Sequence, residues 1–215
     1  MKKAVIFDLD GTLLYTLEDL WNSTNAALRE FGMPERTMDE VRCFIGNGVG
    51  QLIHRAVVPG TSAEDEEQCL AFFRSYYKGH MQEHTRPYEG VISMLDELHQ
   101  MGILTGILSN KFHGATCALS DEYFDELIDA AQGEQTDVPR KPDPTGLLQI
   151  LARLGVAPNE GLYLGDSPED AITAQNAGVD FVAVTWGYRS LEQLCAAGTK
   201  CWINHPSEIK KLLKS

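Results

Sequence analysis

Two aspartates that stand two residues apart form the first candidate site for chemistry in this chain. Asp8 and Asp10 directly follow a short apolar run, residues 4–7, and precede Gly11 and Thr12. In an extended chain, residues i and i+2 point the same way, so both carboxylates converge at the end of a strand. A hard cation such as Mg²⁺ would offset their mutual repulsion. Taken alone, the segment fits an ordinary strand followed by an Asp-Gly turn equally well.

Further carboxylates follow a later apolar run. Asp166 follows residues 162–164 after one glycine, Gly165, so it is predicted to supply a third carboxylate at the same sheet edge and to act as a metal ligand. Asp170 lies three residues after Ser167, which is the spacing of a capping box at a helix start. Asp170 therefore either caps the helix alone or also holds a water bound to the metal.

A hydroxyl, an amide and a lysine complete the set of polar candidates. Ser109 and Asn110 end a predicted strand and could donate hydrogen bonds to a phosphoryl oxygen, although an ordinary strand-end turn also fits them. Lys141 precedes a predicted helix that has Asp143 as its N-cap and Pro144 at its first position. A lysine is by default a solvated surface charge. Lys141, however, is flanked by prolines and stands at a helix start, which favours a role in neutralising the charge of a phosphate and of a nucleophile.

Strand-like runs and helical patterns alternate over most of the chain. Continuous apolar runs predict buried strands at 4–7, 103–108, 162–164 and 181–184, with a weaker candidate at 127–128. Helical patterns, each closed by a glycine suited to a left-handed cap, lie at 91–101, 147–154 and 170–177. This alternation predicts an α/β fold with a parallel sheet.

The stretch from residue 15 to residue 84 breaks the alternation and reads as helical throughout. Its four predicted helices cover 17–31, 38–44, 49–57 and 64–77. Thr16 with Asp19 predicts a capping box at the first of them. We therefore predict a helical domain, 15–84, inserted after the first strand of a core domain made of 1–14 and 85–215. A short terminal helix is predicted at 207–213.

Composition excludes several classes of partner. The 215-residue chain has a formal net charge of −13, which disfavours nucleic acids and anionic membranes. No apolar run reaches the roughly 18–20 residues that span a membrane, and the N-terminal residues do not resemble a signal peptide. The five cysteines are scattered and are interpreted as reduced thiols. We expect a cytoplasmic protein.

The polar segments, taken in order, resemble the four motifs of the haloacid dehalogenase-like hydrolases. The matching segments are Asp8-Leu9-Asp10-Gly11-Thr12, Ser109-Asn110, Lys141-Pro142, and Gly165-Asp166-Ser167 with Asp170. The resemblance implies a Rossmann-like parallel sheet core and a small all-helical cap domain. Within that superfamily the chain is most similar to the phosphoglycolate phosphatases, through residues 45–48, 86–90, 176–178 and 186–189. An acid is usual there at Tyr15 and a proline at Glu18, and these departures bear on the substrate more than on the chemistry.

The resemblance also implies a role for each motif residue. Asp8 would be the nucleophile, Asp10 the acid and base, and Ser109 and Lys141 would complete the catalytic set. Mg²⁺ would be held by Asp8, the backbone carbonyl of Asp10 and Asp166, with Asp170 one layer further out. Residues expected to bind the substrate are Leu9, Gly11, Thr12 and Asn110 in the core, and Gly46, Asn47, Gly48 and Arg55 in the cap. For Arg55, a solvated helix charge is the commoner role.

The expected activity is therefore hydrolysis of a small phosphorylated substrate, with 2-phosphoglycolate as the best guess. Pyrophosphate, nucleotides and sugar phosphates stay open as substrates. A sugar phosphomutase is the enzymatic alternative, although its subfamily commonly has Val where this chain has Thr12. A catalytically silent regulator that binds a phosphorylated ligand is the alternative from another class. Both a monomer and a homodimer are compatible with the resemblance.

Overall fold

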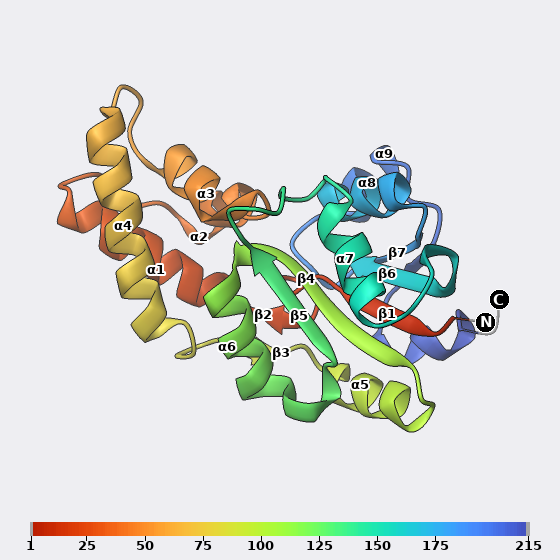
Figure 1. Ribbon diagram of the computed structural model, residues 1–215. Coiled ribbons are helices and arrows are strands. Elements are labelled where there is room, and N and C mark those ends of the chain that lie inside the picture. The colour runs from red at the N-terminus through yellow and green to blue at the C-terminus, as the bar shows by residue number, and fades with distance from the viewer. Residues whose placement is uncertain (1, 214–215) are drawn as a thin grey trace. The chain divides into compact units, whose positions relative to one another are not determined.

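The chain divides into two units. The computed structural model describes residues 2–213; one unit joins the chain up to Leu14 to the chain from Pro87 onward, and the other is Tyr15–Arg86. The return boundary thus lies two residues beyond the expected division at 84/85. The chain passes between the units through two short strands, β2 (Leu14–Tyr15) and β3 (Arg86–Pro87), which pair with one another (Figure 1).

The larger unit is built on a six-stranded sheet in which every pairing is parallel. Its spatial order is β5-β4-β1-β6-β7-β8. The first strand therefore lies inside the sheet, between β4 and β6, which confirms the predicted parallel core. The bounds are β1 (Ala4–Phe7), β4 (Leu104–Phe112), β5 (Ala130–Glu134), β6 (Gly161–Gly165), β7 (Asp180–Val184) and β8 (Trp202–Ile203).

Helices cover both faces of this sheet. In Figure 1, α7 and α8 lie on one side, and α5 and α6 on the other. Successive residues of a strand point to opposite faces, so Ala4 and Ile6 pack with Leu147, Ile150 and Ala174 in one buried cluster. The helices are α5 (Val91–Gln100), α6 (His113–Phe124), α7 (Thr145–Arg153), α8 (Pro168–Ala177) and α9 (Leu191–Ala196), with 3₁₀ turns at Asp125–Leu127, Pro158–Glu160 and Pro206–Lys211.

Two local predictions in this unit were wrong, and a third was nearly right. The weak strand candidate 127–128 follows a 3₁₀ turn, and the strand β5 begins two residues later, where Ala-Ala-Gln-Gly-Glu pairs with β4 despite its weak strand propensity. Helix α7 begins at Thr145 with Pro144 at the N-cap position, although Asp143 still accepts a hydrogen bond from the Thr145 N–H at 2.8 Å. The short terminal helix expected at 207–213 is present as a 3₁₀ helix, Pro206–Lys211.

The smaller unit is helical, as predicted. Its four helices lie close to the predicted positions: α1 (Leu17–Glu30), α2 (Met38–Phe44), α3 (Gly48–Ala56) and α4 (Ala63–His80). Their buried faces include Leu28, Ile53, Phe73 and Tyr77, each fully excluded from solvent. This unit therefore has a core of its own.

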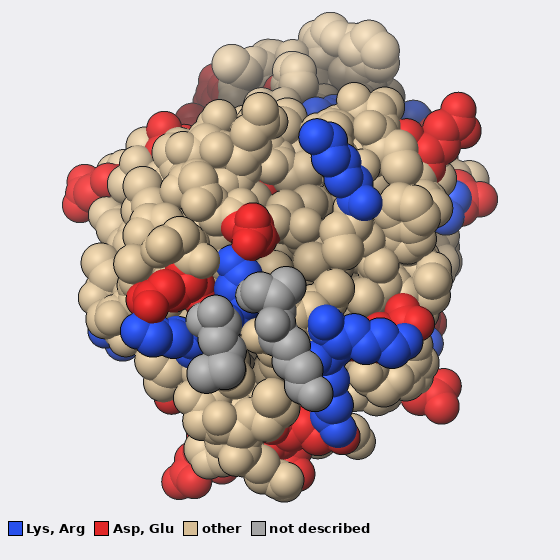
Figure 2. Space-filling view, turned by 90° about the vertical axis from the view of Figure 1, so that its right-hand side faces the viewer, with Lys and Arg blue, Asp and Glu red and all other residues tan. Residues whose placement is uncertain are grey.

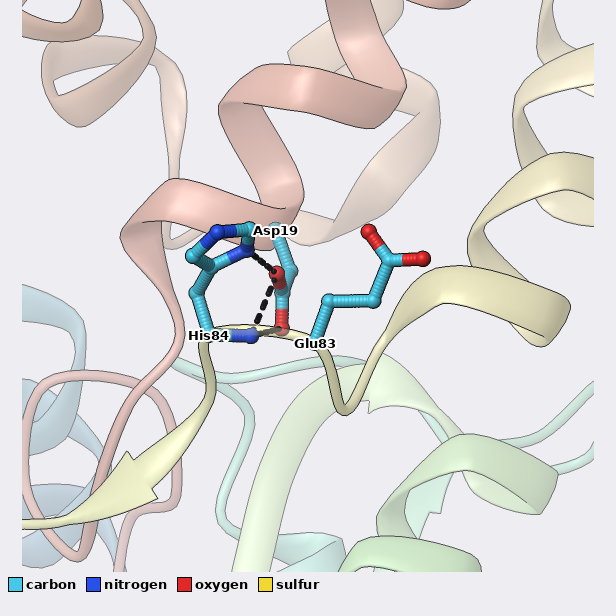
Figure 3. A group of neighbouring side chains, drawn as sticks. All are labelled: Asp19, Glu83 and His84. Carbon is cyan, nitrogen blue, oxygen red and sulfur yellow. Dashed lines mark hydrogen bonds and ion pairs between the residues drawn. The ribbon is translucent and has the colours of Figure 1, made fainter.

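Asp19 has a different task from the predicted one. Thr16 makes no side-chain cap at the start of α1, so the predicted capping box is wrong. The Asp19 carboxylate, 1% exposed, instead accepts hydrogen bonds from the end of the unit. Two of its donors are the N–H and Nδ1 of His84, at 3.0 and 2.9 Å (Figure 3). The N–H and the hydroxyl of Thr85 also donate to it, both at 2.8 Å. The bond to Asp19 raises the pKa of His84.

The acidic group around Asp19 is better explained as a structural tie than as a metal site. Asp19, Glu83 and His84 lie close enough to share a cation. However, both oxygens of Asp19 already accept hydrogen bonds, and the Glu83 side chain in Figure 3 has no drawn interaction with the other two. The contacts fasten the last segment of the helical unit to its first helix.

One face of the protein carries side chains of both charges (Figure 2). On the face shown in Figure 2, Lys and Arg side chains are scattered among Asp and Glu side chains and form no continuous basic area. Within residues 2–213, no helix combines the length and the apolar character that crossing a membrane requires.

Removal of the Asp19 carboxylate should weaken the helical unit. Asp19→Ala leaves buried donors of Thr85 and the His84 N–H without their acceptor, so we expect the free energy of unfolding to fall by about 2–4 kcal/mol. Urea denaturation followed by circular dichroism measures this change. Asp39→Ala is the matched control, because Asp39 also lies in the first turn of a helix but its side chain is 87% exposed. Equal stabilities of the two variants would contradict the structural role of Asp19.

Candidate active site

A buried lysine and a buried aspartate meet at the carboxyl end of the central strand. Asp8 directly follows β1, and its N–H continues the sheet pairing by donating to the Leu164 carbonyl at 2.8 Å. The Lys141 Nζ donates to Asp8 Oδ1 at 2.8 Å and to Asp170 Oδ1 at 2.7 Å. Although burial by itself lowers the pKa of Lys141, the two carboxylates raise it above its ordinary value. Lys141 therefore stays protonated and places a positive charge next to the Asp8 carboxylate.

Lys141 is held in place through its backbone and its side chain. Asn110 Oδ1 accepts from the Lys141 N–H at 2.9 Å, and Asn110 Nδ2 donates to the Lys141 carbonyl at 3.2 Å. The ammonium group also contacts the Leu108 carbonyl and the Tyr163 hydroxyl, both at 3.2 Å. Asn110, expected to contact substrate, thus uses both ends of its amide to fix Lys141. Tyr163 is a site residue that the sequence analysis treated only as part of an apolar strand.

Asp170 combines the helix cap with a second role. The capping box predicted with Ser167 is present, because Asp170 Oδ2 accepts from the Ser167 N–H and hydroxyl at 3.1 and 2.6 Å. Its other oxygen accepts from Lys141 and from the Tyr163 hydroxyl, both at 2.7 Å. Four donors thus occupy the two oxygens, an arrangement that suits a position beside a metal ion better than one in direct contact with it.

Asp166 lies in a space that two glycines leave open. A Cβ atom on Gly11 or on Gly187 would fall on the Asp166 side chain, so glycine is required at both positions. The Asp166 Oδ2 accepts a hydrogen bond from the Tyr188 N–H at 2.6 Å. Burial, together with the charge of Asp170, raises the pKa of Asp166 to about 7. The prediction that Asp166 joins Asp8 at one sheet edge is supported by this geometry.

The donor set fits a divalent cation. Carboxylate oxygens of Asp8, Asp166 and Asp170 all lie within 4.8 Å of one another, and all three residues are buried. Burial and the neighbouring carboxylates raise the pKa of Asp8 well above its ordinary value, so the cluster is short of positive charge even with Lys141 beside it. All-oxygen sites of this kind suit hard cations such as Mg²⁺. The side chain of Asp10 is not part of this group.

Asp10 is paired with a second buried lysine. The Lys111 Nζ lies 3.0 and 3.1 Å from the two carboxylate oxygens of Asp10, and the Lys111 side chain is 1% exposed. Lys111 was missed because the strand was expected to end at Leu108, whereas β4 continues to Phe112 with irregular pairing after Leu108. Its position two residues after Ser109 was the available signal, since that spacing had already linked Asp8 and Asp10.

The loop after Asp8 was expected to supply backbone donors to a phosphate group, but two of these donors have partners within the loop. The Gly11 N–H donates to the Leu14 carbonyl and the Thr12 N–H to the Leu9 carbonyl, so these two donors are engaged within the loop. The Thr12 hydroxyl, in contrast, is buried and has no hydrogen-bond partner among the described residues. Ser109 is buried near the same strand end, where its hydroxyl accepts from the Lys111 N–H at 3.2 Å.

The expected cap residues lie together in the helical unit. Gly46 and Asn47 form the turn between α2 and α3, and Gly48 begins α3. The exposed Arg55 donates to the Phe44 carbonyl at 3.1 Å and to Asn47 Oδ1 at 2.9 Å. Arg55 thus stabilises this turn, and a role in substrate binding stays a prediction.

Comparisons with known proteins agree with the family that the motifs resemble. The model of the family described as haloacid dehalogenase-like hydrolase matches residues 5–184. A phosphoglycolate phosphatase of Thiobacillus denitrificans is 34% identical over 195 residues, 86% of this chain and 84% of that protein. One from Chromobacterium violaceum is 31% identical over 99% of this chain and 97% of its own length. A crystal structure from Lactobacillus delbrueckii subsp. bulgaricus, of a protein predicted to be a phosphoglycolate phosphatase, superposes with a TM-score of 0.93 at 29% identity and covers 99% of both chains.

Loss of the Lys141 charge should destabilise the larger unit. Lys141→Met leaves Asp8 and Asp170 buried without their cation, so we expect the free energy of unfolding to fall by about 3–5 kcal/mol at neutral pH. The difference should narrow as the pH falls towards 5, because protonated carboxyls no longer need the partner. Urea denaturation at several pH values tests this. Lys3→Met, which breaks an exposed pair with Glu160, is the control and should leave stability nearly unchanged.

Proposed function

The chain belongs to the haloacid dehalogenase-like hydrolase family, and on that premise we propose that it is a phosphatase that forms an acyl phosphate on Asp8. The observation that carries the proposal is the buried Asp8 carboxylate, held by Lys141 at 2.8 Å and grouped with Asp166 and Asp170. A carboxylate in that setting is fixed in direction and close to positive charge, which is what a nucleophile towards a phosphate dianion requires.

In the first step, an Asp8 oxygen attacks phosphorus and the bond to the ester oxygen breaks. Asp10 supplies the proton that the leaving oxygen needs, so the alcohol departs uncharged. Lys141 balances negative charge on Asp8 and on the transferred group. The buried hydroxyl of Thr12 and that of Ser109 are the uncharged donors available to the phosphoryl oxygens.

In the second step, water attacks the phosphorus of the acyl phosphate and releases inorganic phosphate. Asp10, now ionised, takes the proton from that water, and Asp8 returns as a carboxylate. The two aspartates thus have separate tasks, consistent with their separate lysine partners.

Mg²⁺ is the proposed cofactor, held by Asp8 and Asp166 with Asp170 beside it. The ion would offset charge on the phosphoryl oxygens and align them for in-line displacement. Its ligands would be carboxylate oxygens already close together, so little rearrangement of the chain is needed.

The proposed substrate is 2-phosphoglycolate. The support is the name of relatives that share 31–34% identity with nearly the whole of this chain. Gly46, Asn47, Gly48 and Arg55 are the residues of the helical unit that we propose for recognition of the rest of the substrate.

Phosphate release should require both a divalent metal and Asp8. We expect hydrolysis of 2-phosphoglycolate with Mg²⁺, little with a chelator, and a loss of about three orders of magnitude or more in Asp8→Asn, which lacks the nucleophile. The assay measures free phosphate from 2-phosphoglycolate, glucose 1-phosphate, pyrophosphate and p-nitrophenyl phosphate. Radiolabelled substrate with acid quenching should label the wild type but not Asp8→Asn.

Asp39→Asn is the matched control, since Asp39 is an exposed aspartate of the helical unit and should behave as wild type. A folded, metal-loaded protein that releases phosphate from none of these substrates would overturn the phosphatase proposal. Faster release from another ester would keep the mechanism and replace the substrate.

Metal affinity should rise with pH between 6 and 8. Asp166 has a pKa of about 7 in the metal-free protein, so below that value a proton competes with the cation, and above it the carboxylate is already ionised. The dissociation constant for Mg²⁺ should therefore be about tenfold weaker at pH 6 than at pH 8, with proton release on binding at the lower pH. Titration calorimetry in buffers of different ionisation enthalpy measures both quantities.

Asp166→Asn should bind Mg²⁺ far more weakly, while Asp39→Asn should retain both the affinity and its pH dependence. Affinity that is the same at pH 6 and pH 8, with no proton release, would contradict the assignment of Asp166 as a ligand.

A further inference from the structure

We infer that Lys111 is a positioning residue for proton transfer: it holds both oxygens of Asp10 so that this carboxyl group faces the leaving-group oxygen of the substrate. The inference rests on the proposed function and extends it, because neither the sequence motifs nor the expected roles included Lys111. The proposed effect is on the orientation of the Asp10 carboxyl group and not on the charge of Lys111 or Asp10.

The contact between the two side chains is close and two-sided. The Lys111 Nζ donates to Oδ1 of Asp10 at 3.0 Å and to Oδ2 at 3.1 Å. The Lys111 side chain is 1% exposed and that of Asp10 is 12% exposed. An ammonium group has three donors, so it can serve both oxygens at once, and turning the carboxyl group about its terminal bond would lengthen one of the two contacts.

Lys111 reaches Asp10 because of the shape of β4. The strand runs on past Ser109 to Phe112, and its pairing with β5 shifts between Leu108 and Phe112. The Lys111 N–H donates to the Ser109 hydroxyl, and its carbonyl accepts from Thr116 at the start of α6. The backbone of Lys111 is thus anchored on both sides, so its side chain approaches Asp10 from a fixed point.

A buried lysine with a purely structural role has different partners in this chain. Lys2, with a side chain 6% exposed, donates to the backbone carbonyls of Asn159 and Gly161 as well as to Asp180. Its contacts tie chain segments together. Lys111 instead contacts both oxygens of one carboxylate in the site, the one to which the proposed mechanism gives the proton transfers.

The two lysines of the site also keep the two aspartates apart in function. Lys141 bonds Asp8 and Asp170, inside the group of carboxylates suited to a metal. Lys111 bonds Asp10, whose side chain is outside that group. Loss of Lys111 should therefore impair proton transfer to the leaving oxygen while leaving metal binding and attack by Asp8 largely intact.

The leaving group gives a readout that a general loss of structure would not. An alkoxide needs a proton as it departs, whereas p-nitrophenolate is stable without one. In Lys111→Met, kcat/KM, which reports the first irreversible step, should fall by about tenfold to a hundredfold for 2-phosphoglycolate and glycerol phosphate, and by less than about threefold for p-nitrophenyl phosphate.

Lys2→Met is the matched control, because it removes a buried lysine that also pairs with an aspartate but lies away from the site. It should alter kcat/KM equally little for all three esters. Lys111→Arg retains a cation with several donors and should recover most of the discrimination between leaving groups. If Lys111→Met does not fold, Lys111→Gln, which retains a donor of shorter reach, is measured with the same esters and should show the same selective loss.

A second comparison asks whether Lys111 acts through Asp10. In an Asp10→Asn background, Lys111→Met should cost little further activity on alkyl esters, since there is no acid left to position. A full additional loss in that background would overturn the inference, as would an equal loss on alkyl and aryl esters in the single variant. Wild-type protein that hydrolyses none of the esters would instead overturn the proposed phosphatase function.

Discussion

Repulsion between buried carboxylates is the constraint on which the rest of the larger unit depends. Asp8, Asp166 and Asp170 are brought together out of water, where each charge is costly. Burial and the nearby charge of Asp170 raise the pKa values of Asp8 and Asp166. Lys141 offsets part of that free-energy cost, because its ammonium group pairs with both Asp8 and Asp170. The cap of α8, the hydroxyl of Tyr163 and the close approach of two glycines to Asp166 complete the support. Even so, the pKa values of Asp8 and Asp166 stay raised, so this group of carboxylates fits a cation.

The centre of the site could be located from the sequence because its position follows from one rule. Polar residues that come directly after buried parallel strands meet at one sheet edge, and this rule alone groups Asp8 with Asp166. The rule did not identify Tyr163 or Lys111 as residues of the site, for different reasons. Tyr163 lies within a strand and reads as core, and Lys111 depends on a shift in the pairing of β4 that no local pattern encodes. Asn110 was predicted to belong to the site. Its hydrogen bonds to the Lys141 backbone could not be predicted, because they join segments that are 31 residues apart in the sequence.

Elements with a strong hydrophobic periodicity were predicted correctly. Elements that form because of pairing with a neighbouring strand were missed. The four helices of the smaller unit and the strands β1, β6 and β7 lie at or near their predicted positions. Strand β5 has a sequence poor in strand formers and exists because β4 provides its partner. Helix α6, with an almost unpatterned sequence, gave no helical signal and was not predicted. The capping box predicted for Thr16 and Asp19 does not form, because the Asp19 carboxylate accepts hydrogen bonds from residues 84 and 85 instead.

The contact of Asp19 with His84 and Thr85 has a consequence for how such chains diversify. Because the first helix of the unit is bonded to the segment that leaves it, the entrance and the exit of the inserted sequence are joined within the unit itself. A change in length or sequence in the interior of residues 15–86 therefore lies between two ends that are already bonded to each other, so it need not alter the spacing at which the chain leaves and re-enters the sheet-bearing unit.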